Sequence, residues 1–463
     1  MAMKIGNVFL VIVAARYLGV ENFGQFSFII SLTTLFLTLT DAGINFYSIR
    51  EIARDKNLAP TIFGNALMLK TFLAFIAIAI LNGIVAIFHY TPQEALGFKI
   101  ASLMLFLDTA IQQVYAMFRA HQKMEYESIG LIIETTIIVS LGITVLLMGY
   151  SYLALLAIYI LAKAINFTFS FNLCLRKITP ITWFWNPGFS KELLKKSFPF
   201  ALNMIFGLVA FRLDIILLRS LKDAYYVGIY RATLSIIFTV IIFAGMYQTA
   251  IYPILSRLFL SSLEKLKYAI ESSMSILLFV SFGIAILLYK FADVIILTIF
   301  GQDYAPSIVI FRILVLMLPL KFINQVLGIT LDAINKQNIR PYIAGTCIVI
   351  NGVLNFIFIS LFSAKGAAVA TILTEFSIFI LYYFFIKRYL YAVPLQKSFA
   401  KASFAAILAY IGMLNTFQLP IILSALIGII VYLLTLYVLK AQKDIGLELL
   451  LQGFSPGNNL SAS

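Results

Sequence analysis

The chain has 463 residues, of which 62% are hydrophobic and only 12% are charged. This composition excludes an ordinary soluble globular protein and indicates an all-α protein that crosses a membrane many times. The net charge of +14 would favour nucleic acid as the partner of a soluble protein. In a membrane protein it instead reflects basic residues in cytosolic loops, so no nucleic-acid partner is expected.

Hydropathy in windows of helix length predicts about fourteen transmembrane helices. The first of them is short, which suggests a start a few residues further upstream. The predicted spans are residues 3–18, 25–47, 62–88, 97–118, 127–149, 151–175, 197–221, 228–255, 268–290, 305–330, 341–362, 366–388, 399–416 and 419–440.

Most of the 34 lysine and arginine residues fall in the even-numbered connections between these spans. Because basic loops stay in the cytosol, both termini are expected there, in a multi-pass protein of the plasma (inner) membrane. The longest connection, Arg176–Lys196, holds Trp183 and Trp185 beside prolines, as interfacial anchors do. The expected organisation is six helices in 1–176, a cytosolic linker in 177–196, six helices in 197–390, two helices in 399–440 and a disordered cytosolic tail in 441–463.

A short pattern follows the first predicted span and returns after the seventh. Residues 16–26 read RYLGVENFGQF, and residues 219–230 read RSLKDAYYVGIY. Both begin Arg-x-Leu and then place a glycine and an aromatic residue at the entry to the next span. Since the pattern occupies the same position in each set of six helices, it indicates repeated halves, which are common in transporters.

The seventh span, Ser197–Leu221, carries two charges in its interior. Arg212 lies about 22 Å along the helix from Ser197, a depth at which a charge faces a partner, water or a ligand rather than lipid. Asp214 is two positions further, about 200° around the helix, so the two side chains cannot pair on its surface. Each is therefore expected to find its partner on a different helix, as in a helix that lines a polar cavity.

Further ionisable side chains in the predicted spans either snorkel or pair near helix ends, or line a polar cavity. Arg312 and Lys321 are nine positions apart, so they face one cavity only if Pro319 bends their helix. The excess of basic side chains in the second half favours an anionic substrate, because desolvated cations attract phosphate. The candidate substrate-binding residues are Arg212, Asp214, Arg312 and Lys321; the candidate cavity or gating residues are Asp41, Arg50, Lys70, Lys163 and Glu375, and Asp108 and Glu134 also lie within spans.

Enzyme signatures are missing from the sequence. It contains no P-loop, no GxGxxG after a strand, no HExxH and no GxSxG. No connection exceeds about twenty residues, which leaves no room for a catalytic domain. Cys174 and Cys347 have no metal-ligand spacing and are expected to be buried hydrophobes. The sequence therefore predicts a protein that is not an enzyme and that has no cofactor and no metal site.

Several segments resemble the polysaccharide-biosynthesis (Wzx-like) flippases of the multidrug/oligosaccharidyl-lipid/polysaccharide (MOP) exporter superfamily. The similarity covers most of the chain, in order, and it is specific to the family but not to the sugar. The matching segments are ARYLGVENFGQFSF (15–28), TDAGINFYSIREIARD (40–55) with its Arg-Glu at Arg50, the Pro-started seventh helix with Arg212 and Asp214, VGIYRA (227–232), and KGAAVATILTE (365–375).

The resemblance implies two six-helix bundles in a V around a central cavity, with two helices appended. It also implies that the protein moves a polyprenyl-pyrophosphate-linked oligosaccharide from the cytosolic to the outer leaflet by alternating access. Arg212 would then contact the phosphates, helped by Lys321 or Arg312, and Asp214 would orient a basic partner or relay a proton. The implied partners are the lipid-linked oligosaccharide, membrane lipids, a coupling ion (H⁺ or Na⁺) and polysaccharide assembly proteins.

Two other functions remain open at this point. A MATE-like drug/cation antiporter shares the implied fold, but it predicts an acidic rather than a basic cavity. A membrane glycan polymerase or ligase needs a large outward loop, whereas the longest connection here is predicted to be cytosolic. The sequence names neither the sugar, the polyprenyl carrier, the coupling ion nor the oligomeric state.

Overall fold

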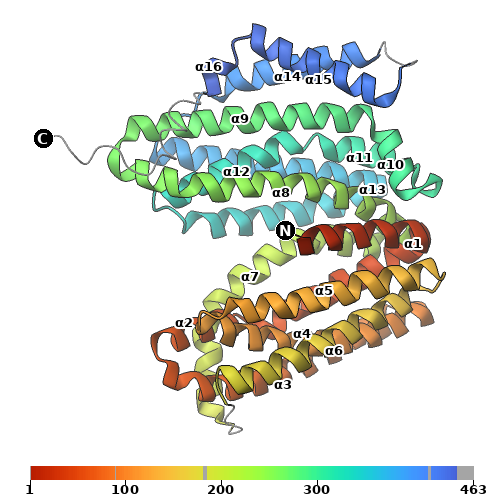
Figure 1. Cartoon of the computed structure of the whole chain (residues 1–463), viewed down its shortest axis with the longest axis vertical. Helices are drawn as coiled ribbons and strands as arrows, with labels where there is room; N and C mark the ends of the chain where they lie inside the picture. Colours follow the sequence, from red (N-terminus) through yellow and green to blue (C-terminus); the bar gives the residue numbers. More distant parts are fainter. Residues whose placement is uncertain (1, 89, 181–184, 415–418, 446–463) are drawn as a thin grey trace, which may run out of the picture. The chain divides into compact units, whose positions relative to one another are not determined.

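The computed structural model of the chain describes residues 2–88, 90–180, 185–414 and 419–445, which are helical with no strand among them (Figure 1). Trp183 and most of the predicted tail lie outside these residues. The helices are α1 (Ala2–Asp41), α2 (Ile44–Arg54), α3 (Ala59–Ile87), α4 (Pro92–Ala120), α5 (Met124–Leu147), α6 (Tyr152–Lys177), α7 (Pro187–Leu221), α8 (Ala224–Ser261), α9 (Leu263–Lys290), α10 (Ala292–Phe300), α11 (Ser307–Val315), α12 (Leu318–Ala333), α13 (Ile339–Tyr389), α14 (Leu395–Leu414), α15 (Ile421–Val438) and α16 (Gln442–Ile445), with short 3₁₀ turns at Lys56–Leu58 and Gln302–Tyr304.

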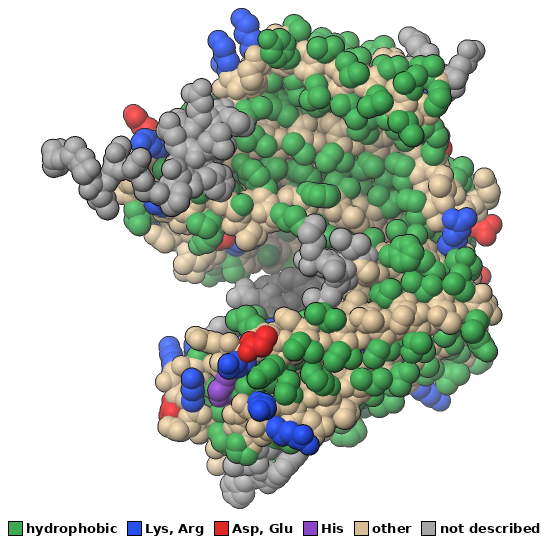
Figure 2. Space-filling model, viewed as in Figure 1, with side chains coloured by type: hydrophobic (Ala, Val, Ile, Leu, Met, Phe, Trp, Pro, Cys, Tyr) green, Lys and Arg blue, Asp and Glu red, His purple; other side chains and the backbone are tan. Residues whose placement is uncertain are grey.

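Ten helical stretches in the described part of the chain are long and apolar enough to cross a membrane. On the face shown in Figure 2, apolar side chains cover the helices and charged side chains gather toward helix ends. The ten stretches are Gly6–Asp41, Lys56–Ile87, Met124–Leu147, Tyr152–Lys177, Ala224–Ser261, Leu263–Lys290, Ser307–Ala333, Ile339–Tyr389, Leu395–Leu414 and Ile421–Val438.

Two of the long helices are interrupted where the sequence predicts one span to end and the next to begin. In α1 the break is at Gly19, whose φ of 74° is open to glycine but strained for other residues. In α13 the break is at Ser363, with φ 52°. Beyond it the chain turns back on itself, since Asn351 Nδ2 donates a hydrogen bond to Thr374 Oγ1 (2.9 Å). α13 is therefore a hairpin of two antiparallel helices.

Among the boundaries that differ from the sequence prediction are the end of α1 and the start of α7. The second predicted span, 25–47, ends early, because Ala42 and Gly43 both have positive φ and stop α1 at Asp41. The separate helix α2 then buries Ile44 and Ile52 and exposes Arg50 and Arg54. α7 begins at Pro187, inside the segment expected to be a linker, and the Asn186 side chain caps it by accepting a hydrogen bond from the Phe189 N–H.

The chain forms two compact units, Met1–Ala232 and Thr233–Ser463, so α8 begins in the first and continues in the second. The first unit packs α3, α4, α5 and α6 together, with α1, α2 and α7 against them. Its core includes Phe63, Val114, Phe118 and Cys174. In the second unit, α14 packs against both α9 and α15 around alanines such as Ala402, Ala405 and Ala409.

Candidate functional site

Arg212 and Asp214 on α7 have partners on two other helices, as their spacing predicts. The Arg212 guanidinium donates a hydrogen bond through Nη1 to the Ser31 hydroxyl on α1 (3.2 Å). The Tyr230 hydroxyl on α8 donates to Asp214 Oδ2 (2.7 Å), and the Ile215 backbone N–H donates to Oδ1 (2.9 Å). The hydrogen bonds to the Asp214 carboxylate thus come from neutral donors.

A second arginine, Arg231, lies at this site and was missed by the sequence analysis. It follows Tyr230 on α8 and interacts electrostatically with both Arg212 and Asp214. The side chain is half-buried, and within the described part of the chain it has no hydrogen-bond or ion-pair partner. Two guanidinium groups therefore interact electrostatically with one carboxylate. The sequence did contain a signal for this residue: the segment VGIYRA (227–232) matches a family pattern, but its arginine was given no role.

Lys163 on α6 is the centre of a buried polar network with two carboxylates. Its ammonium donates to Asp108 Oδ1 on α4 (2.6 Å) and to Glu134 Oε1 on α5 (2.9 Å). The Asn166 amide donates to the other Glu134 oxygen and to the Tyr115 hydroxyl (2.8 Å). Lys163 was expected to line a cavity or a gate, and the structure places it among α4, α5 and α6 with two acidic partners.

Lys70 on α3 is fully buried and has one acidic partner. Its ammonium donates to Asp41 Oδ1 at the end of α1 and to Asn45 Oδ1 on α2, each at 2.8 Å. The structure therefore brings the candidates Asp41 and Lys70 together as an ion pair. A charge with such a partner is stabilised in a low-dielectric core, where an unpaired one would be very unfavourable.

The candidates of the second unit fall into two separate ion pairs. Lys321 on α12 donates to Glu375 on α13 (2.6 Å), and the Asn324 amide also donates to that carboxylate (3.0 Å). Arg312 on α11 instead forms an ion pair with the exposed Asp293 on α10 (2.8 Å). The helix ends between Arg312 and Lys321, after Val315 and before Leu318, so the two basic side chains lie on different helices with different partners.

Arg50 differs from the other candidates because it is exposed on α2. It forms an ion pair with its neighbour Glu51 (2.8 Å) and lies over the Tyr47 ring. Exposed pairs of this kind contribute little to stability.

One buried ion pair outside the candidate set joins α7 to α4. Arg219 donates to Glu94 Oε1 (2.7 Å), and its guanidinium lies over the rings of Phe28 and Tyr90. Glu94 also accepts from Thr91 in a capping box at the start of α4. Burial raises the pKa of the Tyr90 hydroxyl, while the positive charge of Arg219 opposes that shift.

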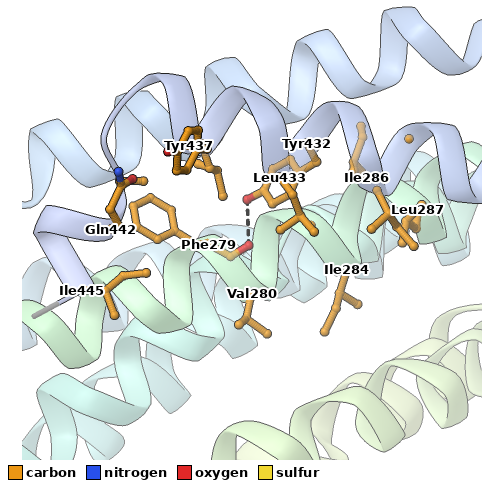
Figure 3. A pocket seen from close by; sticks show the side chains of 15 residues that line it. Phe279, Val280, Ile284, Ile286, Leu287, Tyr432, Leu433, Tyr437, Gln442 and Ile445 are labelled. Carbon is orange, nitrogen blue, oxygen red and sulfur yellow. Dashed lines mark hydrogen bonds between the residues drawn. The ribbon is translucent and has the colours of Figure 1, made fainter. Parts of the chain in front are cut away.

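The second unit contains an apolar pocket of about 450 Å³ among α9, α15 and α16 (Figure 3). Phe279, Val280 and Leu287 line it from α9, and Leu433 lines it from α15. Tyr432 donates a hydrogen bond from its hydroxyl to the Phe279 carbonyl (2.7 Å). This lining suits a hydrocarbon chain and not a charged group.

Comparison with known proteins agrees with this architecture. Residues 2–259 match the family described as polysaccharide biosynthesis protein. The capsular polysaccharide biosynthesis protein CapF of Staphylococcus aureus is 23% identical over 397 residues, which cover 82% of this chain and 95% of CapF. An uncharacterized membrane protein of Methanocaldococcus jannaschii, MJ1375, is 23% identical over 391 residues, 81% of this chain and 92% of that protein.

Two solved structures show the same fold. The lipid II flippase MurJ, in an inward closed conformation, aligns with a TM-score of 0.73 at 15% identity and covers 96% of this chain and 98% of MurJ. A multidrug resistance MATE transporter of the MOP superfamily, facing inward, aligns with a TM-score of 0.69 at 14% identity and covers 84% of this chain and 95% of the transporter. Because residues 2–259, more than half of the chain, match that family, the chain belongs to the polysaccharide biosynthesis protein family.

Proposed function

We propose that this protein moves a polyprenyl-pyrophosphate-linked oligosaccharide from the cytosolic to the outer leaflet of the cell membrane. The observation that carries the proposal is that two guanidinium groups, those of Arg212 and Arg231, interact electrostatically with the carboxylate of Asp214. Guanidinium groups bind phosphate oxygens in bidentate geometry, and such bonds are strong where water is scarce. A pyrophosphate would bring negatively charged oxygens to these two guanidinium groups.

The other basic candidates are less available to an anion. Lys70, Lys163 and Lys321 each donate to at least one carboxylate, and Arg312 pairs with Asp293. We propose that Lys321 and Arg312 assist Arg212 at most by exchanging their present partners for phosphate. Asp214 would orient Arg231, and Asp41, Arg50, Lys70, Lys163 and Glu375 would hold or gate the helices around the cavity.

The proposed architecture has fourteen transmembrane helices, in two six-helix bundles that form a V, with the last two predicted spans, 399–416 and 419–440, appended. Two of the ten long helical stretches are broken at a point where two predicted spans meet, one at Gly19 and the other at Ser363. α4 and α7 lie outside those ten stretches but coincide with the predicted spans 97–118 and 197–221. The corresponding domains are 1–176, 197–390 and 399–440, with a cytosolic linker and a cytosolic tail at 441–463.

Transport by alternating access would use no enzymatic step. We propose that both termini are cytosolic, and that assembly proteins take up the flipped glycan on the outer side. A drug/cation antiporter is the second candidate, because the network of Lys163 has more carboxylates than ammonium groups. An antiporter of this kind needs a cation site, but Lys163 occupies the space between the two carboxylates.

Binding of polyprenyl pyrophosphate to the detergent-purified protein, measured by isothermal titration calorimetry, tests the proposed site. A hydrogen bond to a charged group contributes about 1.5–3 kcal/mol, and about 1.4 kcal/mol is a factor of ten in affinity. Arg212→Ala and Arg231→Ala should therefore each weaken binding at least tenfold. The exposed Arg54 provides the matched control, and Arg54→Ala should leave the affinity unchanged. Equal affinity in all four proteins would contradict the proposal.

A further inference from the structure

The Lys163 network contains three ionisable groups, of which one is basic and two are acidic. The ammonium of Lys163 lies between two carboxylates, Asp108 at 2.6 Å and Glu134 at 2.9 Å. All three side chains are largely buried among α4, α5 and α6, with at most 14% of any of them exposed. If all three were ionised, the network would carry a net negative charge in a region where isolated charges are strongly disfavoured.

Other buried ion pairs of the first unit are balanced. Lys70 has Asp41 as its one carboxylate partner, and Arg219 has Glu94. Each of these pairs has one positive and one negative group, so full ionisation leaves no excess charge. The network around Lys163 differs from them by one additional carboxyl group.

The groups that surround the network do not supply a second positive charge. The Glu134 oxygen that does not bind Lys163 accepts from the Asn166 amide, which is neutral. Tyr115 on α4 reaches the network through the same amide, and Tyr159 on α6 interacts electrostatically with Lys163, Glu134 and Arg231. Among the described residues, no hydrogen bond joins Arg231 to either carboxylate.

Other charges of the first unit are already paired. On α1 and α3, Asp41 and Lys70 form their own ion pair. At the ends of α4 and α5, Arg119 and Glu127 form another. In the described part of the chain, no group of three or more His, Cys, Asp or Glu side chains could hold a metal ion. A proton is the positive charge that this space can accept.

We propose that Asp108 and Glu134 together bind one proton, which makes the network of two carboxyl groups and one lysine electrically neutral. Two carboxyl groups in one site titrate as a coupled pair, so the proton belongs to the pair rather than to either residue. The proposal rests on the charges within the first unit and is independent of the substrate.

Infrared difference spectroscopy of the purified full-length protein tests the proposal without any substrate. A protonated carboxyl group has a C=O stretching band that a carboxylate lacks. We expect such a band in the wild-type protein at neutral pH, with a shift on transfer to D₂O and a loss only at alkaline pH. Absence of the band at neutral pH would overturn the proposal, and this measurement needs no variant.

Two variants assign the band to the network. In Asp108→Asn or Glu134→Gln, the one remaining carboxylate pairs with Lys163 and has no reason to keep a proton. Either single substitution should therefore abolish the whole band, although it removes only one of the two carboxyl groups. Asp214→Asn is the control, because Asp214 is another carboxyl group held by neutral donors; it should leave the band intact. A band that disappears only in Asp214→Asn would place the proton at the other site and overturn the proposal.

Discussion

Gly24 on α1 and Gly228 on α8 each pack against the backbone of the helix that carries the other. A Cβ added at Gly24 would lie 1.9 Å from the carbonyl oxygen of Ala224, and one added at Gly228 would lie 2.0 Å from that of Val20. These glycines occupy equivalent positions in the two copies of the short repeated pattern. The repeat found in the sequence is therefore also a reciprocal contact in space.

We expect Gly24→Ala or Gly228→Ala to separate these helices, because backbone atoms cannot yield as a flexible side chain can. Overpacking of this kind destabilises by about 1–3 kcal/mol. Thermal unfolding of the purified protein measures the effect. Gly245→Ala on the same helix α8 is the control, since nothing lies within 4 Å of a Cβ there; alanine should stabilise that position slightly. Equal melting temperatures for Gly228→Ala and Gly245→Ala would contradict the close contact.

Removing Lys70 should destabilise the first unit strongly. Lys70→Met leaves Asp41 as an unpaired buried carboxylate, and breaking a buried pair in this way costs about 3–5 kcal/mol. Combining it with Asp41→Asn removes the unpaired charge, so the double variant should recover part of the stability. Denaturant or thermal unfolding gives the comparison. Lys123→Met serves as control, because Lys123 forms only an exposed pair with Glu125. A double variant no more stable than Lys70→Met would show that charge is not the cause.

Because Lys163 has two carboxylate partners, we expect removal of the lysine to lower stability more than removal of one carboxylate. Glu134→Gln leaves a balanced pair of Lys163 and Asp108, so it should have little effect on stability. Lys163→Met leaves both carboxyl groups without a cation, and the protein should then unfold at a lower temperature that falls further as the pH rises. Thermal unfolding at acidic and alkaline pH checks both statements. An equal loss of stability in the two variants would contradict the assignment of one surplus carboxyl group.

Exchange of charges distinguishes pairing from substrate binding at Lys321. Lys321→Glu places two carboxylates together with Glu375, and Glu375→Lys places two ammonium groups together, so each should lower expression and stability. The double variant restores the attraction and should recover both properties. If Lys321 also binds phosphate, transport will stay low in the recovered double variant. Arg312→Ala, which breaks a more exposed pair with Asp293, should cost no more than about 1 kcal/mol.

The sequence predicted the parts of the fold that depend on hydropathy and local conformation. The spans on either side of Gly19 and Ser363 were separated correctly, because polar or glycine-containing turns interrupt the apolar runs there. The early end of α1 was missed because Ala42 and Gly43 lie within the apolar window of the predicted span 25–47. Hydropathy does not report the positive φ that these two residues adopt. The start of α7 within the expected linker was missed because its first turns are amphipathic, whereas a hydropathy window detects continuous apolar runs.

The site was predictable in part. The spacing of Arg212 and Asp214 showed that they need partners on other helices, but tertiary packing decides which helices those are. That Lys163 has two carboxylates and Lys70 one could not be derived from positions along the chain. Arg231 was missed although it lies in the recognised segment VGIYRA, and the pair of Arg219 with Glu94 was missed because its members are 125 positions apart.

Flipping itself tests the account most directly. The protein is reconstituted in liposomes with a fluorescent polyprenyl-pyrophosphate oligosaccharide, and protection of the fluorophore from an external quencher is followed over time. The account predicts protein-dependent exchange between leaflets that is lost in Arg212→Ala and Arg231→Ala and retained in Arg54→Ala. Well-inserted wild-type protein without exchange, with or without an ion gradient, would contradict the flippase, and normal exchange in both arginine variants would remove the cationic site from the mechanism.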